Sequence, residues 1–197
     1  MAVCILLLGG AVSAGCNKAQ QTNMSALDAA GIPPEVIDQL KGLQVTEVEV
    51  QQLVLAHQAG MSDEGCIEMV RIAHSHHQPF SSAEAVTGLM NSGMKESSVL
   101  EMARLNLVPM WAGEAQAMRL AGVPESMIMI VARRRAAGQP TISGDRIVKL
   151  RNTGMPDSQI IAEIQKGTTD AQADRMIAYH EALMTTHGFV RQSGRRK

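Results

Sequence analysis

Apolar residues recur along this chain at the spacing of an α-helix, and one short phrase recurs with them. Each copy of the phrase has a small or polar residue, then a glycine, then an isoleucine, methionine or valine. The five glycines are Gly31, Gly60, Gly93, Gly122 and Gly154, separated by 29, 33, 29 and 32 residues. A period of this length is typical of proteins built from stacked supersecondary units.

The phrase predicts a turn between two helices. Glycine suits the left-handed position that ends a helix, because it carries no Cβ. Pro, Ser or Lys follows the apolar residue, with an acid next in four copies, as suits the start of a second helix. Thr46-x-x-Glu49 and Ser81-x-x-Glu84 are candidate capping boxes at the starts of first helices. Apolar pairs three residues apart give those first helices one apolar face: Leu53/Ala56, Val86/Leu89, Ala115/Met118 and Ile147/Leu150.

Five hairpins of about thirty residues cannot each bury an apolar face alone, so they should pack together. The pattern predicts an all-α domain of tandem αα-hairpin repeats over residues 26–190, either a solenoid-like or a bundled array. A longer helix over about residues 170–187 is expected to cap the array, and residues 191–197 to form a basic flexible tail. Over about residues 25–166 the chain resembles the short helix–glycine–helix tandem units of secreted bacterial proteins. That resemblance implies no characterised activity.

The N-terminal segment has a different pattern. Residues 1–14 are uncharged and apolar, a run too short to cross a bilayer as a helix, and small residues lead up to Cys16. The segment resembles the signal peptide of bacterial lipoproteins, which ends at a cysteine that is acylated. It departs from that pattern by having Ser13 three residues before the cysteine and no Lys or Arg at its start. The alternative is a buried N-terminal helix, which the Gly9-Gly10 pair and the polar residues after Cys16 disfavour.

The resemblance to lipoproteins implies a location as well as an anchor. We expect a signal peptide at residues 1–15, a lipidated Cys16 and a polar tether through residue 25. The protein would then be attached to a membrane of the bacterial cell envelope, facing the periplasm or the exterior. Cys66 would remain as its only thiol, and its apolar helical surroundings predict a buried, structural role.

Composition narrows the classes of function. Of 197 residues, 45% are apolar, only 2% are aromatic and 14 are methionines, which are expected to fill the core. The scarcity of aromatic residues argues against β-sheet architectures and against recognition of nucleic acid by stacking. The chain has no Gly-x-Ser-x-Gly, phosphate-loop, dinucleotide or haem-attachment motif. We therefore expect a protein that is not an enzyme, holds no cofactor and has no small-molecule substrate.

One cluster of metal-ligating residue types is present. His74, His76 and His77 place three imidazoles within four residues, which is a composition that Zn, Cu or Ni can bind. Their spacing does not place them on one helical face. The alternative is a solvated helix end before Pro79, where histidine is favourable because of the helix dipole.

Charge is distributed unevenly along the chain. Residues 1–100 contain 4 bases and 10 acids, whereas residues 101–197 contain 14 bases and 9 acids. A basic surface for an acidic partner or for lipid headgroups is one interpretation. The alternative is a set of cations at helix C-termini and on solvated faces. The candidate partner-binding residues are Arg133, Arg134, Arg135, Arg146, Lys149 and Arg151.

These patterns favour one functional hypothesis and leave one alternative. The first is a lipid-anchored, non-enzymatic helical-repeat protein that acts as an interaction scaffold or accessory subunit for another envelope or membrane protein. Helical arrays offer extended surfaces suited to that role. The alternative is a protein that binds a small ligand or a transition metal through the three histidines.

Overall fold

The computed structural model describes residues 22–193, with side chains for residues 22–185, and this part of the chain is all-helical without strands. The predicted signal peptide, Cys16 and most of the predicted tether lie outside these residues. The helices are α1 (Ser25–Ala29), α2 (Pro34–Gly42), α3 (Glu47–Gln58), α4 (Asp63–Ser75), α5 (Ala83–Asn91), α6 (Glu96–Arg104), α7 (Val108–Leu120), α8 (Glu125–Ala136), α9 (Gly144–Asn152), α10 (Asp157–Lys166) and α11 (Asp170–Ser193).

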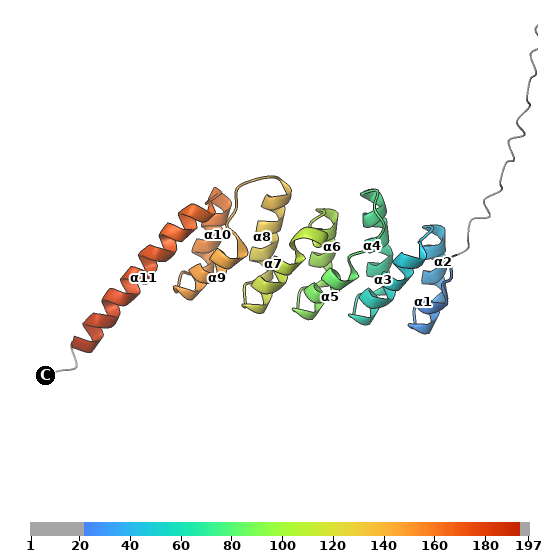
Figure 1. Ribbon diagram of the computed structural model, residues 1–197, viewed down its shortest axis with the longest axis horizontal. Helices are drawn as coiled ribbons and strands as arrows, with labels where there is room; N and C mark the ends of the chain where they lie inside the picture. The colour runs from blue at the N-terminus through green and yellow to red at the C-terminus, as the bar shows by residue number, and fades with distance from the viewer. Residues whose placement is uncertain (1–21, 194–197) are drawn as a thin grey trace, which may run out of the picture.

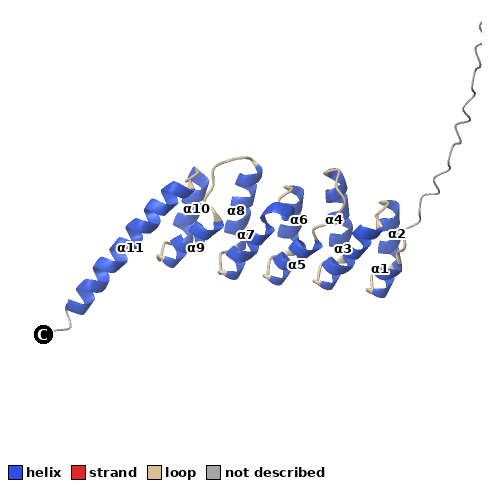
Figure 2. Cartoon of the chain, viewed as in Figure 1, coloured by secondary structure: helices blue, strands red, loops and turns tan. Residues whose placement is uncertain are grey.

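The helices form a row of hairpins, α1/α2 through α9/α10, followed by α11 (Figure 1). The first helices of the hairpins pack in sequence as one layer, and α11 joins this layer against α9. The second helices pack in sequence as the other layer, which consists of α2, α4, α6, α8 and α10. Figure 2 shows the same two rows of helices joined by turns, with a longer loop after α8. The predicted tandem αα-hairpin array is therefore confirmed, and the row remains open rather than closing into a bundle.

Both helices of every hairpin end in the same kind of turn. At the five predicted glycines φ lies between 79° and 94°, and the next residue donates its N–H to a carbonyl five residues back, as Ile32 does to Leu27. This is the Schellman arrangement. The second helices end in the same way, at five further residues with positive φ: Gln44, His77, Asn106, Gly138 and Gly167.

The core is the seam between the two layers. All eight residues of the predicted first-helix pairs are buried, with at most 1% of their surface exposed. The apolar residues that follow the turn glycines, such as Met61 and Val123, are buried in the same core. Each buried Leu, Ile or Met side chain contributes roughly 1.5–3 kcal/mol relative to exposure. Methionine therefore fills the core here, as expected.

Hairpin length alternates along the row. The second hairpin has helices of 12 and 13 residues and the fourth has 13 and 12, whereas the third has 9 and 9 and the fifth 9 and 10. Each long hairpin is followed by a long linker, at residues 76–82 and 137–143, and both linkers contain a Gln-Pro pair. The larger repeat is thus a pair of hairpins, with Gly31 and Gly93 62 residues apart and Gly60 and Gly122 also 62 apart.

Two expectations about element ends need correction. The Ser81/Glu84 capping box is wrong: α5 begins one residue later than expected, after Ser82, which makes no side-chain cap. Gln52 of the preceding hairpin accepts the N–H of Ala83, the first residue of α5 (3.0 Å). The predicted flexible tail at residues 191–197 begins inside α11, whose backbone is helical through Ser193. The Thr46/Glu49 capping box is confirmed.

The closing helix α11 caps only part of the row. It packs on α9 through the buried residues Ala173 and Ile177 and then continues beyond the array (Figure 1). The side chains of Tyr179, Leu183 and Met184 are exposed on this continuation. Among the described residues, none of the helices has the length and apolar character needed to cross a membrane.

Candidate functional site

The polar chemistry of the chain gathers where the two long linkers pass from one hairpin to the next. We call these the 2/3 junction, built around residues 76–82, and the 4/5 junction, built around residues 137–143. Each joins a long hairpin to a short one. The predicted histidine cluster lies at the first junction, and Arg133, Arg134 and Arg135 end the helix before the second.

The 2/3 junction is organised by one buried acid, Glu49, which is only 1% exposed. Its carboxylate accepts the backbone N–H of Thr46 (2.9 Å) and of Phe80 (2.9 Å), and it lies 2.8 Å from Nε2 of His74. Burial alone would raise the pKa of Glu49, but the hydrogen bonds from Thr46, Phe80 and His74 outweigh it and hold the pKa below the ordinary value. As a carboxylate, Glu49 therefore bonds three segments: the residue before α3, the end of α4 and the linker before α5.

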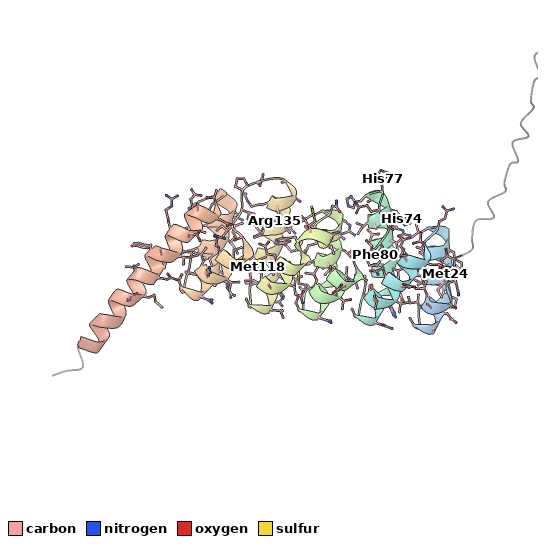
Figure 3. All side chains as sticks on the ribbon, viewed as in Figure 1. Met24, His74, His77, Phe80, Met118 and Arg135 are labelled. Carbon is pink, nitrogen blue, oxygen red and sulfur yellow. The ribbon has the colours of Figure 1, made fainter. Side chains whose placement is uncertain are left out.

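The three histidines of the predicted cluster have three different surroundings. His74 pairs with Glu49, whereas His77 is exposed at the outer end of α4 and takes the left-handed turn position with φ 56° (Figure 3). His76 faces a pocket. Across the described part of the chain, no group of three His, Cys, Asp or Glu side chains is placed to hold a metal ion. The structure thus offers this alternative no preformed metal site.

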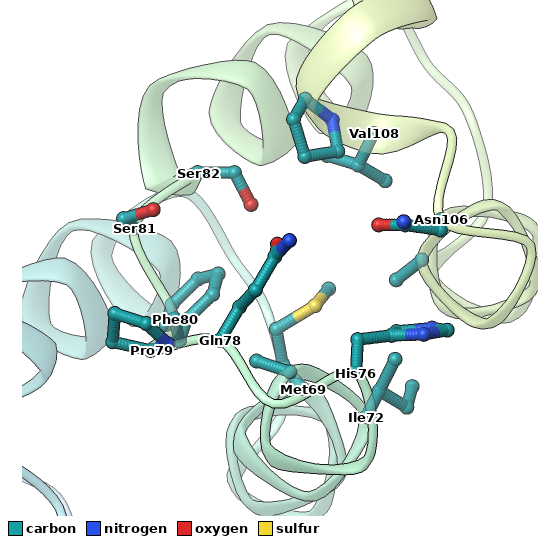
Figure 4. Close-up of a pocket in the computed structure, with 13 residues that line it drawn as sticks. Met69, Ile72, His76, Gln78, Pro79, Phe80, Ser81, Ser82, Asn106 and Val108 are labelled. Atoms are coloured by element: carbon teal, nitrogen blue, oxygen red, sulfur yellow. The ribbon is translucent and has the colours of Figure 1, made fainter.

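The pocket beside His76 lies between the second and third hairpins, and its interior volume is about 40 Å³ (Figure 4). Met69 and Phe80 form part of its apolar lining, while Gln78, Ser82 and Asn106 turn their polar ends toward one another across it. The Nε2 atom of His76 is buried and has no hydrogen-bond partner among the described residues. Such a volume accommodates a few waters or one small polar group.

Different residues hold the two hairpins together at the 4/5 junction. Trp111, only 2% exposed, stands eleven residues before its turn glycine, as Glu49 does before its own. Arg135 lies over the Trp111 ring, with Cζ 5.1 Å from the ring centroid, in a cation–π contact. Glu114 bonds both Nη2 of Arg135 (3.1 Å) and the N–H of Gly144 (2.6 Å), so it joins the fourth hairpin to the fifth.

Five of the six predicted basic residues are engaged by acceptors within the array. Arg133 pairs with Glu101, Arg146 with Asp170 and Asp174, and Arg151 with Asp157, while Arg134 and Arg135 bond groups of the 4/5 junction. Most of these contacts join one hairpin to its neighbour or to α11. Of the six candidate residues, only Lys149 makes no side-chain hydrogen bond or ion pair within the described chain.

Ion pairs between neighbouring hairpins also repeat in the second-helix layer. Glu68 pairs with Arg104 (2.9 Å) and Glu101 with Arg133 (2.6 Å). In each case the acid stands eight residues after its turn glycine and the arginine eleven after the next one. The hydrogen bond from Arg133 lowers the pKa of Glu101. Sequence reasoning missed these pairs, although their spacing relative to the glycines is a signal that a search between copies could have found.

Cys66, the one cysteine among the described residues, has the buried position that the sequence predicts. Cys66 is fully buried in the core. Burial, together with the charges of Asp63 and Glu96, raises the pKa of its thiol to about 12. A thiol with this pKa is not a nucleophile at neutral pH.

Large apolar side chains are exposed on the two long first helices, α3 and α7. Val48 is 57% exposed and Leu55 47% on α3, and Met110 is 81% exposed and Leu120 69% on α7. Val48 and Met110 occupy the same place in the repeat, each twelve residues before its turn glycine. We call these four residues the apolar set of α3 and α7.

Comparison of the chain with protein-family models, with curated proteins and with solved structures finds no match in any of the three.

Proposed function

We propose that this chain is a lipid-anchored, non-enzymatic helical-repeat protein that serves as an interaction scaffold or accessory subunit for another protein of a bacterial envelope. The observation that carries this proposal is the apolar set of α3 and α7 on an open array. The array has its own continuous core, so these four side chains, between 47% and 81% exposed, are not needed for folding. Large apolar side chains that stay exposed on corresponding helices of a repeat are candidates for a protein interface.

The repeat favours a protein partner over a small ligand. Val48 and Met110 recur at the same position of two long hairpins, with the short third hairpin between them. A partner that contacts both must span more than one repeat, as partners of helical arrays do. Methionine adapts its shape to a partner surface because its side chain is flexible and polarizable.

Charge supports a partner with a basic surface. The N-terminal hairpins expose acids that make no side-chain hydrogen bond or ion pair within the described chain: Asp28, Glu35, Glu47, Glu64 and Glu84. In contrast, most of the arginines of the C-terminal hairpins are already paired within the array. Complementary charge on a partner would steer association toward the N-terminal half.

The envelope location rests on the segment before the array. The lipoprotein-like signal ending at Cys16 would place a lipid at the N-terminus, and the polar residues that follow would connect it to α1. A lipid anchor restricts the protein to a membrane surface and raises its effective concentration toward a membrane partner.

Native co-purification from gently solubilised membranes tests the proposal. We expect the wild-type chain to migrate in a defined complex with a stoichiometric partner. A Val48→Glu/Met110→Glu double variant should lose that partner, whereas Ser97→Glu, an exposed change on the other layer, should keep it. A wild-type chain that migrates alone, at the size of its 21 kDa monomer or below, would contradict the proposal.

A further inference from the structure

The pocket beside His76 has a counterpart in the 4/5 junction. The linkers Gln78-Pro79 and Gln139-Pro140 correspond, and each runs toward the start of a short first helix. The second helices also correspond, because α4 and α8 both begin three residues after their turn glycine. Because α4 is one residue longer than α8, the counterpart of Arg134 is found by counting back from the linkers: Ala73 and Arg134 each stand six residues before the linker proline.

In the 4/5 junction this place is filled by a guanidinium. Arg134 donates from Nε and Nη2 to the carbonyl of Pro140 (both 3.1 Å) and from Nη1 to the carbonyl of Gln165 (3.0 Å). Its Nη2 lies so close to Gly167 that a Cβ there would come within 3.0 Å of it. The group thus fits between the linker and the C-terminal end of the next second helix.

In the 2/3 junction the same place is open. Ala73 carries only a methyl group and cannot reach across, and Asn106 takes the left-handed position that corresponds to Gly167. Pro79, the counterpart of Pro140, makes no hydrogen bond within the described chain, and Nε2 of His76 is buried without a partner. Gln78, Ser82 and Asn106 present further oxygen atoms around the space (Figure 4).

We propose that this pocket binds the guanidinium of an arginine side chain carried by the partner protein. The inference rests on the proposed function and specifies the chemistry of its partner. An arginine of the partner would then occupy the place that Arg134 of this chain occupies in the 4/5 junction. A guanidinium suits it because it is planar and presents several donors at fixed angles, whereas an ammonium is a compact and strongly hydrated charge.

The case for a guanidinium rests on hydrogen-bond acceptors and not on helix dipoles. The pocket touches the C-terminal ends of α4 and α6 and also the N-terminal ends of α5 and α7, so the dipole contributions oppose one another. Arg104, at the end of α6, is already paired with Glu68 and does not fill the pocket.

The probe is N-acetyl-arginine amide, with N-acetyl-lysine amide as its matched control, titrated into the ¹⁵N-labelled full array and followed by NMR. We expect saturable shifts confined to residues around the pocket, such as Gln78 and Asn106, for the arginine compound. The lysine compound should bind at least tenfold more weakly. Uniform or unsaturable shifts, or equal binding of the two compounds, would overturn the inference, as would preferential binding of acetate or phosphate.

Two variants test the comparison from opposite sides. Ala73→Arg should fill the pocket from within and abolish binding of the arginine compound, while Arg134→Ala should open the 4/5 junction and create a second arginine site. If Ala73→Arg does not fold, the Arg134→Ala variant still decides the matter by the number of sites. Unchanged binding in a folded Ala73→Arg variant, or no second site in Arg134→Ala, contradicts the inference.

Failure of this inference is distinguishable from failure of the proposed function. If free arginine does not bind but the partner is retained by wild type and lost by Val48→Glu/Met110→Glu, the scaffold function stands and the arginine pocket does not. If arginine binds in the pocket but no partner co-purifies, the pocket stands as an arginine site and the scaffold function is contradicted.

Discussion

The 2/3 and 4/5 junctions have linkers of equal length and the same kind of left-handed turn, but different side-chain chemistry. In both, a side chain of the long first helix accepts the N–H that begins the next hairpin: Gln52 from Ala83 at one junction and Glu114 from Gly144 at the other. The buried centre differs, because Glu49 with His74 stands where Trp111 with Arg135 stands in the other. The repeat therefore requires an acceptor for the first N–H of the next hairpin, while the centre of the junction is free to vary.

Because the centre of a junction can vary, an array of hairpins with the same turn and stacking acquires different local sites. The 4/5 junction satisfies its own carbonyls with Arg134 and is closed, whereas the 2/3 junction leaves a pocket beside His76. Differences at a few positions thus change the chemistry of one junction without disturbing the stacking. Solenoid repeats vary in this way because each unit contacts only its neighbours.

The largest expected difference between the junctions comes from their acids. Glu49→Ala leaves the N–H groups of Thr46 and Phe80 and the His74 ring without their buried acceptor, and should lower the free energy of unfolding by about 3–5 kcal/mol. Glu114→Ala, at a half-buried site, should cost only about 1–2 kcal/mol. Urea unfolding followed by circular dichroism measures both. Equal costs would mean that the two acids play the same part.

Backbone conformation provides a second, opposed pair of changes. His77 and Gly138 end α4 and α8 in the left-handed region, with φ 56° and 65°. His77→Gly should stabilise the protein by about 0.5–1 kcal/mol, and Gly138→Ala should destabilise it by about 1 kcal/mol, because a Cβ is strained in this conformation. Thermal unfolding with hydrogen exchange at each linker measures both. A loss of stability in His77→Gly would show that the imidazole makes a contribution larger than the strain.

Close packing at the start of α9 predicts an effect of similar size. A Cβ at Gly144 would lie 2.9 Å from Cγ of both Glu114 and Met118, whereas the corresponding residue of the 2/3 junction is Ala83, whose Cβ is accommodated without exposure. Gly144→Ala should therefore cost about 1–3 kcal/mol through overpacking. Faster hydrogen exchange of the α9 amides in Gly144→Ala would support this prediction. Unchanged stability of the variant would contradict it.

Acid should weaken the 2/3 junction through Glu49. Its pKa in the folded protein lies below the ordinary value of 4.5, so its contribution to stability is complete above that value and is lost as the pH falls through the folded pKa. Protection of the Phe80 N–H against hydrogen exchange should fall in this acid range more steeply in wild type than in Glu49→Gln. Identical pH dependence in the two proteins would show that the carboxylate is not the group responsible.

Much of the fold could be predicted from the sequence because its determinants are local. The turn glycines, the apolar residue after each and the stripes before them act within one hairpin, and all took their predicted places. The turns at Gln44, His77 and Asn106 were not predicted, because these residue types indicate a left-handed turn much less strongly than glycine does. The alternation of long and short hairpins was present in the glycine spacings but becomes clear only when helix lengths are compared.

The candidate sites were less predictable because they depend on contacts between hairpins. The basic residues are a charged cluster in sequence, but in the array Arg133 and Arg146 meet acids 32 and 28 residues away. His74 meets Glu49 over 25 residues, which no local motif indicates. The pocket requires the ends of α4 and α6 and the linker between them, so its residues come together only in the stacked structure.

Site-specific photo-crosslinking in the native envelope tests the interaction function most directly. A photoreactive amino acid at Met110 or Val48 should give one crosslinked partner, and the same group at Ser97 on the other layer should give none. The crosslink should also disappear when the partner's contacting segment is deleted, while the fold of the array is unchanged. No crosslink at Met110 and Val48, or equal crosslinking at Ser97, would contradict docking through the apolar set of α3 and α7.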